Sequence, residues 1–146
     1  MKIKGLEKIY IIHYAKLKDR REYLEKKIKE MKISDIVEWE IAPENEVLTK
    51  EDYSKYDGSK EAREERFRVL GNIIKNKYYQ LNKSEIAVTL QHLRVLKKIS
   101  KSKSKKAFMI LEDDALFEED FLDLLKNLLI ELNKISWDIC YTDSGG

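Results

Sequence analysis

The sequence contains few of the residues and runs that define several protein classes. Among 146 residues there is one cysteine, Cys140, so no disulfide can form within one chain. No linker rich in proline or glycine and no internal repeat divides the chain, which has one proline and five glycines. No apolar run approaches the roughly 20 residues that cross a bilayer, and the N-terminus lacks the apolar core of a signal peptide. We therefore predict a single domain over residues 1–146.

An excess of charge of one sign is also missing. The sequence has 29 lysines and arginines against 27 aspartates and glutamates, for a net charge of +2. This balance gives no general argument for nucleic-acid binding. We expect a cytoplasmic protein. The basic run Lys97–Lys106 leaves contact with the inner face of the membrane open, because lysines can attract anionic lipid or nucleotide. A solvated loop at a helix C-terminus, where cations are favoured, explains the run better.

Apolar patterns predict strands that alternate with helices. A hydrophobic content of 42% indicates a globular chain with a sizeable core. Strands are expected at Lys8–Tyr14, Val37–Ile41, Ala107–Leu111 and Trp137–Tyr141, and helices at about 19–32, 83–99 and after Phe117. This order predicts an α/β fold with parallel strands. Cys140 falls within the last expected strand, where we predict a buried thiol.

A short apolar run leads directly into three carboxylates. Ala107–Leu111 is typical of a strand buried on both faces, and Glu112, Asp113 and Asp114 follow it. Ligands of open α/β sheets bind at the carboxyl ends of strands, and adjacent carboxylates repel one another unless a cation lies among them. Mg²⁺ or Mn²⁺ would suit such oxygen ligands. The alternative is a solvated acidic turn. A P-loop ATPase is disfavoured because no G-x-x-x-x-G-K-[ST] motif is present.

Two arginines stand at the predicted start of the first helix. Arg20 and Arg21 follow Asp19, and cations in a first helical turn oppose the helix dipole. An anion at that end would reverse the sign of the effect, because free N–H groups and guanidinium groups both bind phosphate. The alternative is that both arginines point into solvent or pair with Glu22 and Glu25.

Glu85 and His92 are seven residues apart in the predicted helix at 83–99 and share one of its narrow polar faces. The helix also has apolar residues on two sides, which predicts that both sides are buried. A single histidine on such a helix is more often a core residue than a ligand. His92 therefore has a structural interpretation beside the functional one.

Four blocks in this order resemble glycosyltransferase family 25, the lipopolysaccharide and lipooligosaccharide glycosyltransferases whose relatives include the collagen galactosyltransferases. They are the strand that leads to Asp19-Arg20-Arg21, the segment from Leu81 to His92, Leu111–Asp114 with Phe117, and Trp137–Tyr141. The sequence departs from the family pattern at several positions, among them Gln91, where the family has serine.

The resemblance implies a GT-A-like (Rossmann-like) nucleotide-sugar-binding sheet flanked by helices. It also implies a UDP-sugar donor and a divalent metal, Mn²⁺ or Mg²⁺. Members of the family continue well beyond the Trp-Asp strand. We therefore expect the chain to contain the donor-binding half, with the sheet incomplete at its C-terminus and the acceptor half missing.

The resemblance also assigns roles to residues. Glu112 and Asp114 would contact the metal and the nucleotide-sugar, Arg20 and Arg21 would lie near the nucleotide, and Glu85 and His92 would face or support the site. The catalytic set would be Asp114 and Asp143. Asp143 is a candidate general base by its position at a strand end and not through the resemblance, and a base beyond residue 146 is the alternative.

The activity that the resemblance implies is metal-assisted, inverting transfer of galactose or another hexose from a UDP-sugar. The acceptor would be a glycan or glycolipid in lipopolysaccharide biosynthesis, and nucleic acid is not an expected partner. Oligomerisation is left open. The alternative is a non-catalytic remnant or nucleotide-sugar-binding module that keeps the same fold.

Overall fold

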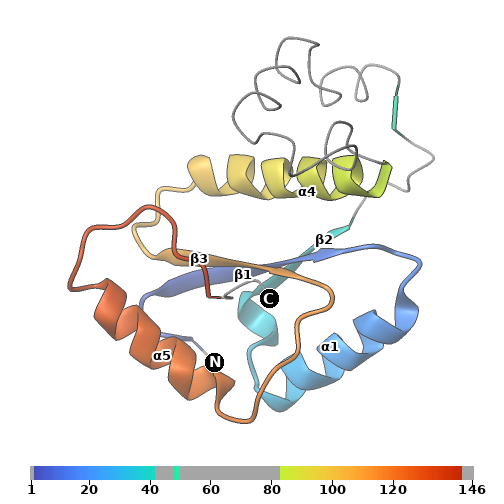
Figure 1. The fold of residues 1–146 in the computed structure, drawn as a ribbon. Helices are drawn as coiled ribbons and strands as arrows, with labels where there is room; N and C mark the ends of the chain where they lie inside the picture. Colours follow the sequence, from blue (N-terminus) through green and yellow to red (C-terminus); the bar gives the residue numbers. More distant parts are fainter. Residues whose placement is uncertain (1, 42–47, 50–82, 143–146) are drawn as a thin grey trace, which may run out of the picture. The chain divides into compact units, whose positions relative to one another are not determined.

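The structure of the protein, a computed structural model, describes residues 2–41, 48–49 and 83–142. Its elements in chain order are β1 (Leu6–His13), α1 (Lys18–Glu30), a 3₁₀ turn (Ser34–Ile36), β2 (Val37–Ile41), α4 (Lys83–Ser100), β3 (Ala107–Glu112) and α5 (Phe121–Leu132). The strands form a parallel sheet in the order β2-β1-β3 (Figure 1). The predicted α/β class is confirmed.

β1 is the central strand because its sequence is apolar on both faces. Ile9, Tyr10, Ile11 and Ile12 are each at most 5% exposed. A strand with a neighbour on each side and cover on both faces excludes water from every side chain, which is the pattern expected in parallel sheets.

The described chain forms two compact units. The first consists of Met1–Ile11, Asp19–Glu38 and Lys103–Gly146, and the second of Ile12–Lys18 and Trp39–Ser102. β1 and β2 each run from the first unit into the second. The prediction of a single domain stays a prediction.

In the first unit, α1 and α5 lie on the same side of the strands (Figure 1). α1 buries Leu24 and Ile28, four residues apart, and α5 buries Leu125 and Leu129 at the same spacing. Residues four apart share one face of a helix, so each helix presents a single apolar stripe to the core.

β3 is less buried than its sequence predicts. All five of its apolar residues, Ala107–Leu111, are only partly buried, although we expected a strand buried on both faces. The partial burial of β3 results from its position in the sheet. Among the described residues β3 is an edge strand with β1 as its one neighbour, and the tight cover that β1 receives does not extend to it.

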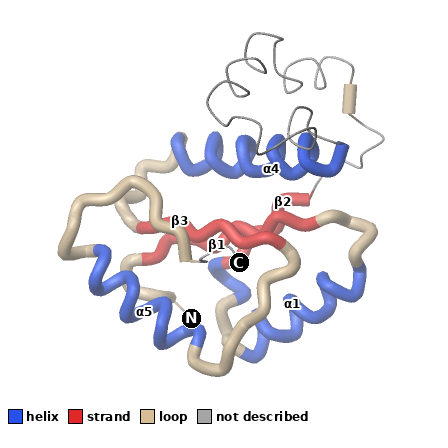
Figure 2. The backbone as a smooth tube through the Cα atoms, viewed as in Figure 1, coloured by secondary structure: helices blue, strands red, loops and turns tan. Residues whose placement is uncertain are grey.

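The predicted strand at Trp137–Tyr141 is wrong for this structure. The segment after α5 is a loop (Figure 2). A strand requires a ladder partner for its N–H and C=O groups, and this segment does not pair with the free edge of β3. Ile139 is 70% exposed and Tyr141 87%. Cys140 is exposed as well, so the predicted buried thiol is also wrong.

In the second unit, α4 confirms the helix expected at 83–99. Ile86, Ala87 and Val95 are buried, whereas Leu93 and Leu96 are about half exposed, at 45% and 47%. Ile86 and Val95 are nine residues apart, which places them on nearly opposite sides of the helix. Both predicted sides therefore contain a buried residue, although neither is buried along its whole length.

Gln91 of α4 is 1% exposed, and its side chain holds the helix to the strand ends. Nε2 donates to the carbonyl oxygen of His13 at 3.2 Å and to that of Glu40 at 3.1 Å. His13 is the last residue of β1, and Glu40 is the last but one of β2. A buried amide with its donors satisfied adds two hydrogen bonds where an apolar side chain would add none.

Within the described residues, 2–41, 48–49 and 83–142, no helix is both long enough and apolar enough to span a membrane.

Candidate functional site

The first unit joins the start of α1 to the carboxyl end of β3 through one ion pair. Nη1 of Arg20 lies 2.8 Å from Oδ1 of Asp113 and 3.9 Å from Oδ2 of Asp114. The Asp113 side chain is 9% exposed and that of Arg20 is 46% exposed. The arginine therefore reaches from solvent to a carboxylate that is almost wholly buried.

This pair explains two unfavourable features of the sequence together. Arg20 is in the first turn of α1, where the helix dipole disfavours a cation, and Asp113 is the middle one of three adjacent carboxylates. Each group supplies the opposite charge that the other requires. The hydrogen bond to Asp113 is the main reason that the pKa of Arg20 rises further above its ordinary value, with the charges of Asp113 and Asp114 adding to it.

The three carboxylates do not face the same way. Asp113 is buried, whereas Glu112 and the Asp114 side chain, which is 64% exposed, face solvent. β3 ends at Glu112, and the chain turns at Asp113 and Asp114, where the N–H of Ala115 donates to the carbonyl oxygen of Glu112 at 3.2 Å. The turn gives the three carboxylates their different exposures. The sequence placed Asp113 in the acidic cluster but assigned it no role of its own, because its partner Arg20 is 93 residues away in the chain.

Arg21 has a different environment from Arg20. Its Nε donates to Oε1 of Glu25, one helical turn further along the exposed side of α1. This is the surface pairing that the sequence offered as the alternative for both arginines. A pair of this kind is worth only a few tenths of a kcal/mol.

The other predicted site residues lie elsewhere. Glu85 is exposed in the first turn of α4 and His92 is partly buried further along it, and both belong to the second unit. Their roles stay predictions. Asp143 is outside the described residues, as are Leu81 and Asn82.

The second unit contains a buried carboxylate that the sequence did not single out. Glu40, 8% exposed, accepts hydrogen bonds from Nε of Arg94 at 2.6 Å and from Nζ of Lys98 at 2.8 Å. Burial raises the pKa of Glu40, but the bonds from Lys98 and Arg94 together outweigh it, so the pKa lies below 4.5. Arg94 and Lys98 are four apart on α4, and that spacing was the available signal.

A metal ion has no ready-made protein cage in residues 2–41, 48–49 and 83–142, where no three histidine, cysteine or acidic side chains converge. Glu112 and Asp114 are the two exposed carboxylates at the end of β3. Protein-bound Mg²⁺ commonly takes one or two carboxylates and completes its shell with water and substrate phosphate. The two side chains fit that mode and do not fit a closed structural site.

Acidic side chains and an arginine at the carboxyl end of parallel strands are typical of α/β proteins that bind phosphorylated ligands at that edge. Comparison with protein families narrows this class. The profile of Glycosyltransferase family 25 (LPS biosynthesis protein) matches residues 6–142. The chain belongs to glycosyltransferase family 25, as the sequence motifs predicted. No curated protein and no solved structure is detectably similar to it.

Membership of the family implies a transferase with a GT-A-like fold, a sugar donor and an acceptor, within lipopolysaccharide biosynthesis. It also suggests that the donor is a nucleotide-sugar.

Proposed function

We propose that the carboxyl end of β3 binds the diphosphate of a UDP-sugar, and that the protein transfers the hexose to a glycan acceptor of lipopolysaccharide biosynthesis. The observation that supports this most directly is the fixed position of Arg20 against Asp113, beside the two exposed carboxylates of Glu112 and Asp114. Cation and anions are then both available at the edge where ligands of such sheets bind.

Arg20 is suited to hold a phosphate. Asp113 takes one N–H of Nη1, and a guanidinium has five N–H donors in a planar fork. The remaining donors can form the paired hydrogen bonds that phosphate accepts. The buried carboxylate limits the rotamers of the long side chain, so less side-chain entropy is lost when a diphosphate binds.

Glu112 and Asp114 are the residues that would hold a divalent metal, Mn²⁺ or Mg²⁺, together with the diphosphate oxygens. When bound, the ion would offset the negative charge that builds on the departing diphosphate. Arg20 supplies a fixed positive charge to the same group from the protein itself.

Transfer to a hydroxyl also requires a proton acceptor. We propose an inverting, single-displacement reaction in which a carboxylate takes that proton. Asp114 and Asp143 are the candidates. The roles of Glu85, His92 and Arg21 as groups that support the nucleotide are part of the same proposal.

Calorimetric titration with UDP, with and without Mn²⁺, tests the donor site. We expect binding that Mn²⁺ strengthens and that Asp114→Asn weakens by about tenfold, or about 1.4 kcal/mol. Asp123→Asn is the matched control, because Asp123 is an exposed aspartate of the same unit that pairs with Lys126. The proposal fails if UDP does not bind or if the two variants behave alike.

A second comparison uses the adjacent arginines. Arg20→Gln should weaken UDP binding more than Arg21→Gln, because Arg21 pairs on the surface of α1 whereas Arg20 reaches the end of β3.

Release of UDP from UDP-sugars in the presence of acceptor then separates an enzyme from a binding module. Binding with no release above background would favour the module.

A further inference from the structure

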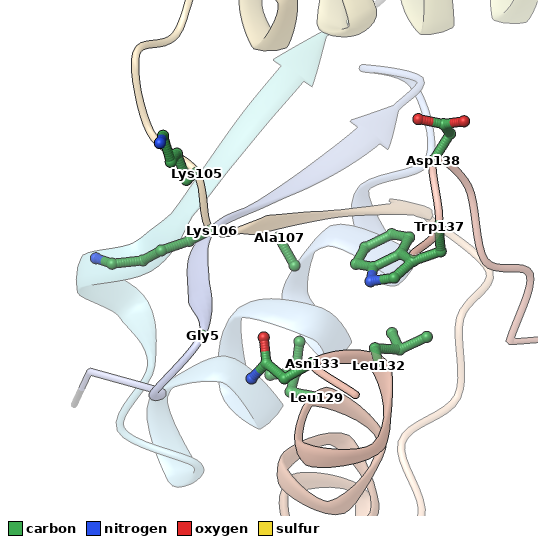
Figure 3. Close-up of a pocket in the computed structure, with 9 residues that line it drawn as sticks. All are labelled: Gly5, Lys105, Lys106, Ala107, Leu129, Leu132, Asn133, Trp137 and Asp138. Carbon is green, nitrogen blue, oxygen red and sulfur yellow. The ribbon is translucent and has the colours of Figure 1, made fainter. Parts of the chain in front are cut away.

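The first unit contains a cavity of about 360 Å³ at the opposite end of β3 from the acidic cluster (Figure 3). Its walls come from the start of β3, the end of α5 and the loop that follows, with Gly5 at one side. Because a strand rises about 3.3 Å per residue, the six residues of β3 separate the two places by roughly 20 Å. The cavity is therefore distinct from the proposed donor site.

One wall of the cavity is apolar and includes a flat aromatic ring. Trp137 lines the cavity together with Ala107 and Leu132 (Figure 3), and it is 37% exposed. Pockets for small ligands combine such apolar and aromatic walls with a few polar groups that orient the ligand. An indole face matches the apolar C–H face of a pyranose ring in size and flatness.

Polar groups surround this wall. Asn133 and Asp138 also line the cavity, and both can hydrogen-bond to hydroxyl groups. Gly5, with φ +88°, lines the cavity with its backbone alone. A Cβ atom added at this residue would lie 3.8 Å from Nδ2 of Asn133. A side chain at residue 5 would therefore reduce the space beside the amide.

The rim of the cavity is cationic. Lys105 and Lys106 extend outward from it, on the side away from Asp138 (Figure 3). Nζ of Lys106 pairs with Glu7 at 3.0 Å. Lys105 is exposed and forms no ion pair with any residue in the described part of the chain. One positive charge at the rim is thus left to attract an anion.

We propose that this cavity binds a hexose unit with an anionic substituent. The pyranose ring would stack on Trp137, its hydroxyls would bond to Asn133 and Asp138, and the substituent would meet Lys105. Given the proposed glycosyl transfer, the cavity is a non-catalytic subsite that holds a distant, acidic or phosphorylated sugar of the acceptor glycan.

Titration of the full chain with three probes tests the ligand class: glucose 6-phosphate, glucose and inorganic phosphate. We expect glucose 6-phosphate to bind about tenfold more tightly than either fragment, at about 0.15 M salt, where charges are screened beyond about 8 Å. Equal binding of glucose would overturn the anionic part of the proposal, and equal binding of phosphate would reduce the site to a general anion site. Absence of binding by all three would overturn it entirely.

Paired variants locate the binding. Trp137→Ala should weaken binding of glucose 6-phosphate by about tenfold, whereas Tyr141→Ala, at an 87% exposed aromatic of the same loop outside the cavity, should not. Lys105→Ser should weaken binding of glucose 6-phosphate without changing binding of glucose. Lys103→Ser is its control, because Lys103 is exposed and does not line the cavity. If either pair of variants behaves alike, the ligand binds elsewhere.

UDP titration of the same variants tests whether the donor site and the cavity are independent binding sites. Trp137→Ala and Lys105→Ser should bind UDP as the wild type does. Loss of UDP binding in Asp114→Asn with intact binding of glucose 6-phosphate would show two independent sites. Failure of glucose 6-phosphate alone would overturn the subsite and leave the donor site standing.

Discussion

Glu40 offers a direct test of how the second unit is held together. The perturbation is Glu40→Gln, which keeps the shape of the side chain and removes its charge. Glu38→Gln is a matched control on the same strand. Glu38 pairs with Lys8 at 2.6 Å, and its side chain is 34% exposed. The side chain of Glu40 is 10% exposed and pairs with both Arg94 and Lys98.

The magnitude follows from those partners. A hydrogen bond that involves a charged group contributes about 1.5–3 kcal/mol. Arg94 and Lys98 are 39% and 43% exposed, so both recover water when the carboxylate is lost, and glutamine retains one acceptor oxygen. We therefore expect Glu40→Gln to lower the free energy of unfolding by about 2 kcal/mol, and Glu38→Gln by about 0.5 kcal/mol, the usual value of a surface pair.

Urea denaturation of both variants and the wild type at several pH values is the assay. The pKa of Glu40 in the folded protein lies below 4.5, so its contribution is complete above pH 4.5 and is lost as the pH falls through the folded pKa. The difference in free energy of unfolding between the wild type and Glu40→Gln should shrink toward zero in acid. Equal effects of the two substitutions at neutral pH, or a gap that stays constant in acid, would refute this reasoning.

Three further predictions concern single positions. Gln91→Leu should cost about 2 kcal/mol, because two strand-end carbonyls lose a donor. Thr89→Val, which removes an exposed hydroxyl bonded to the preceding helical turn, should change the urea midpoint little, and equal midpoints for the two variants would contradict this account. Cys140 is exposed and should react fully with a thiol reagent in the native protein, whereas reaction only in denaturant would show a buried thiol. Gly5→Ala should lower stability by about 1–2 kcal/mol, the cost of a left-handed backbone for an L-residue; an unchanged melting temperature would show that the strain is relieved.

The strands and helices that the sequence predicted correctly are those with strong local patterns. β1, β2, β3, α1 and α4 lie within a few residues of the expected ranges. The segment Trp137–Tyr141 failed because strand formation depends on a partner elsewhere in the chain, and local pattern contains no information about that partner. The partial burial of β3 has the same origin, since edge or centre is a property of the sheet order.

For the candidate site, the sequence indicated the right groups but not the pairing. Arg20 and the acidic cluster were each recognised as electrostatically unfavourable by themselves, and an external ligand was invoked for both. The structure shows that Arg20 and Asp113 satisfy each other. Their separation of 93 residues explains why spacing rules, which describe neighbours within one element, could not identify the contact.

That separation has a consequence for how ligand binding and folding are linked. The ion pair forms only when α1, which contains Arg20, and β3, which precedes Asp113, have both reached their native positions. A ligand held by Arg20 therefore binds the folded first unit and not its separate parts. Such a ligand stabilises the native state by mass action. Resistance to proteolysis of the whole unit, from its N-terminal strand to α5, should therefore rise with ligand concentration as one cooperative step.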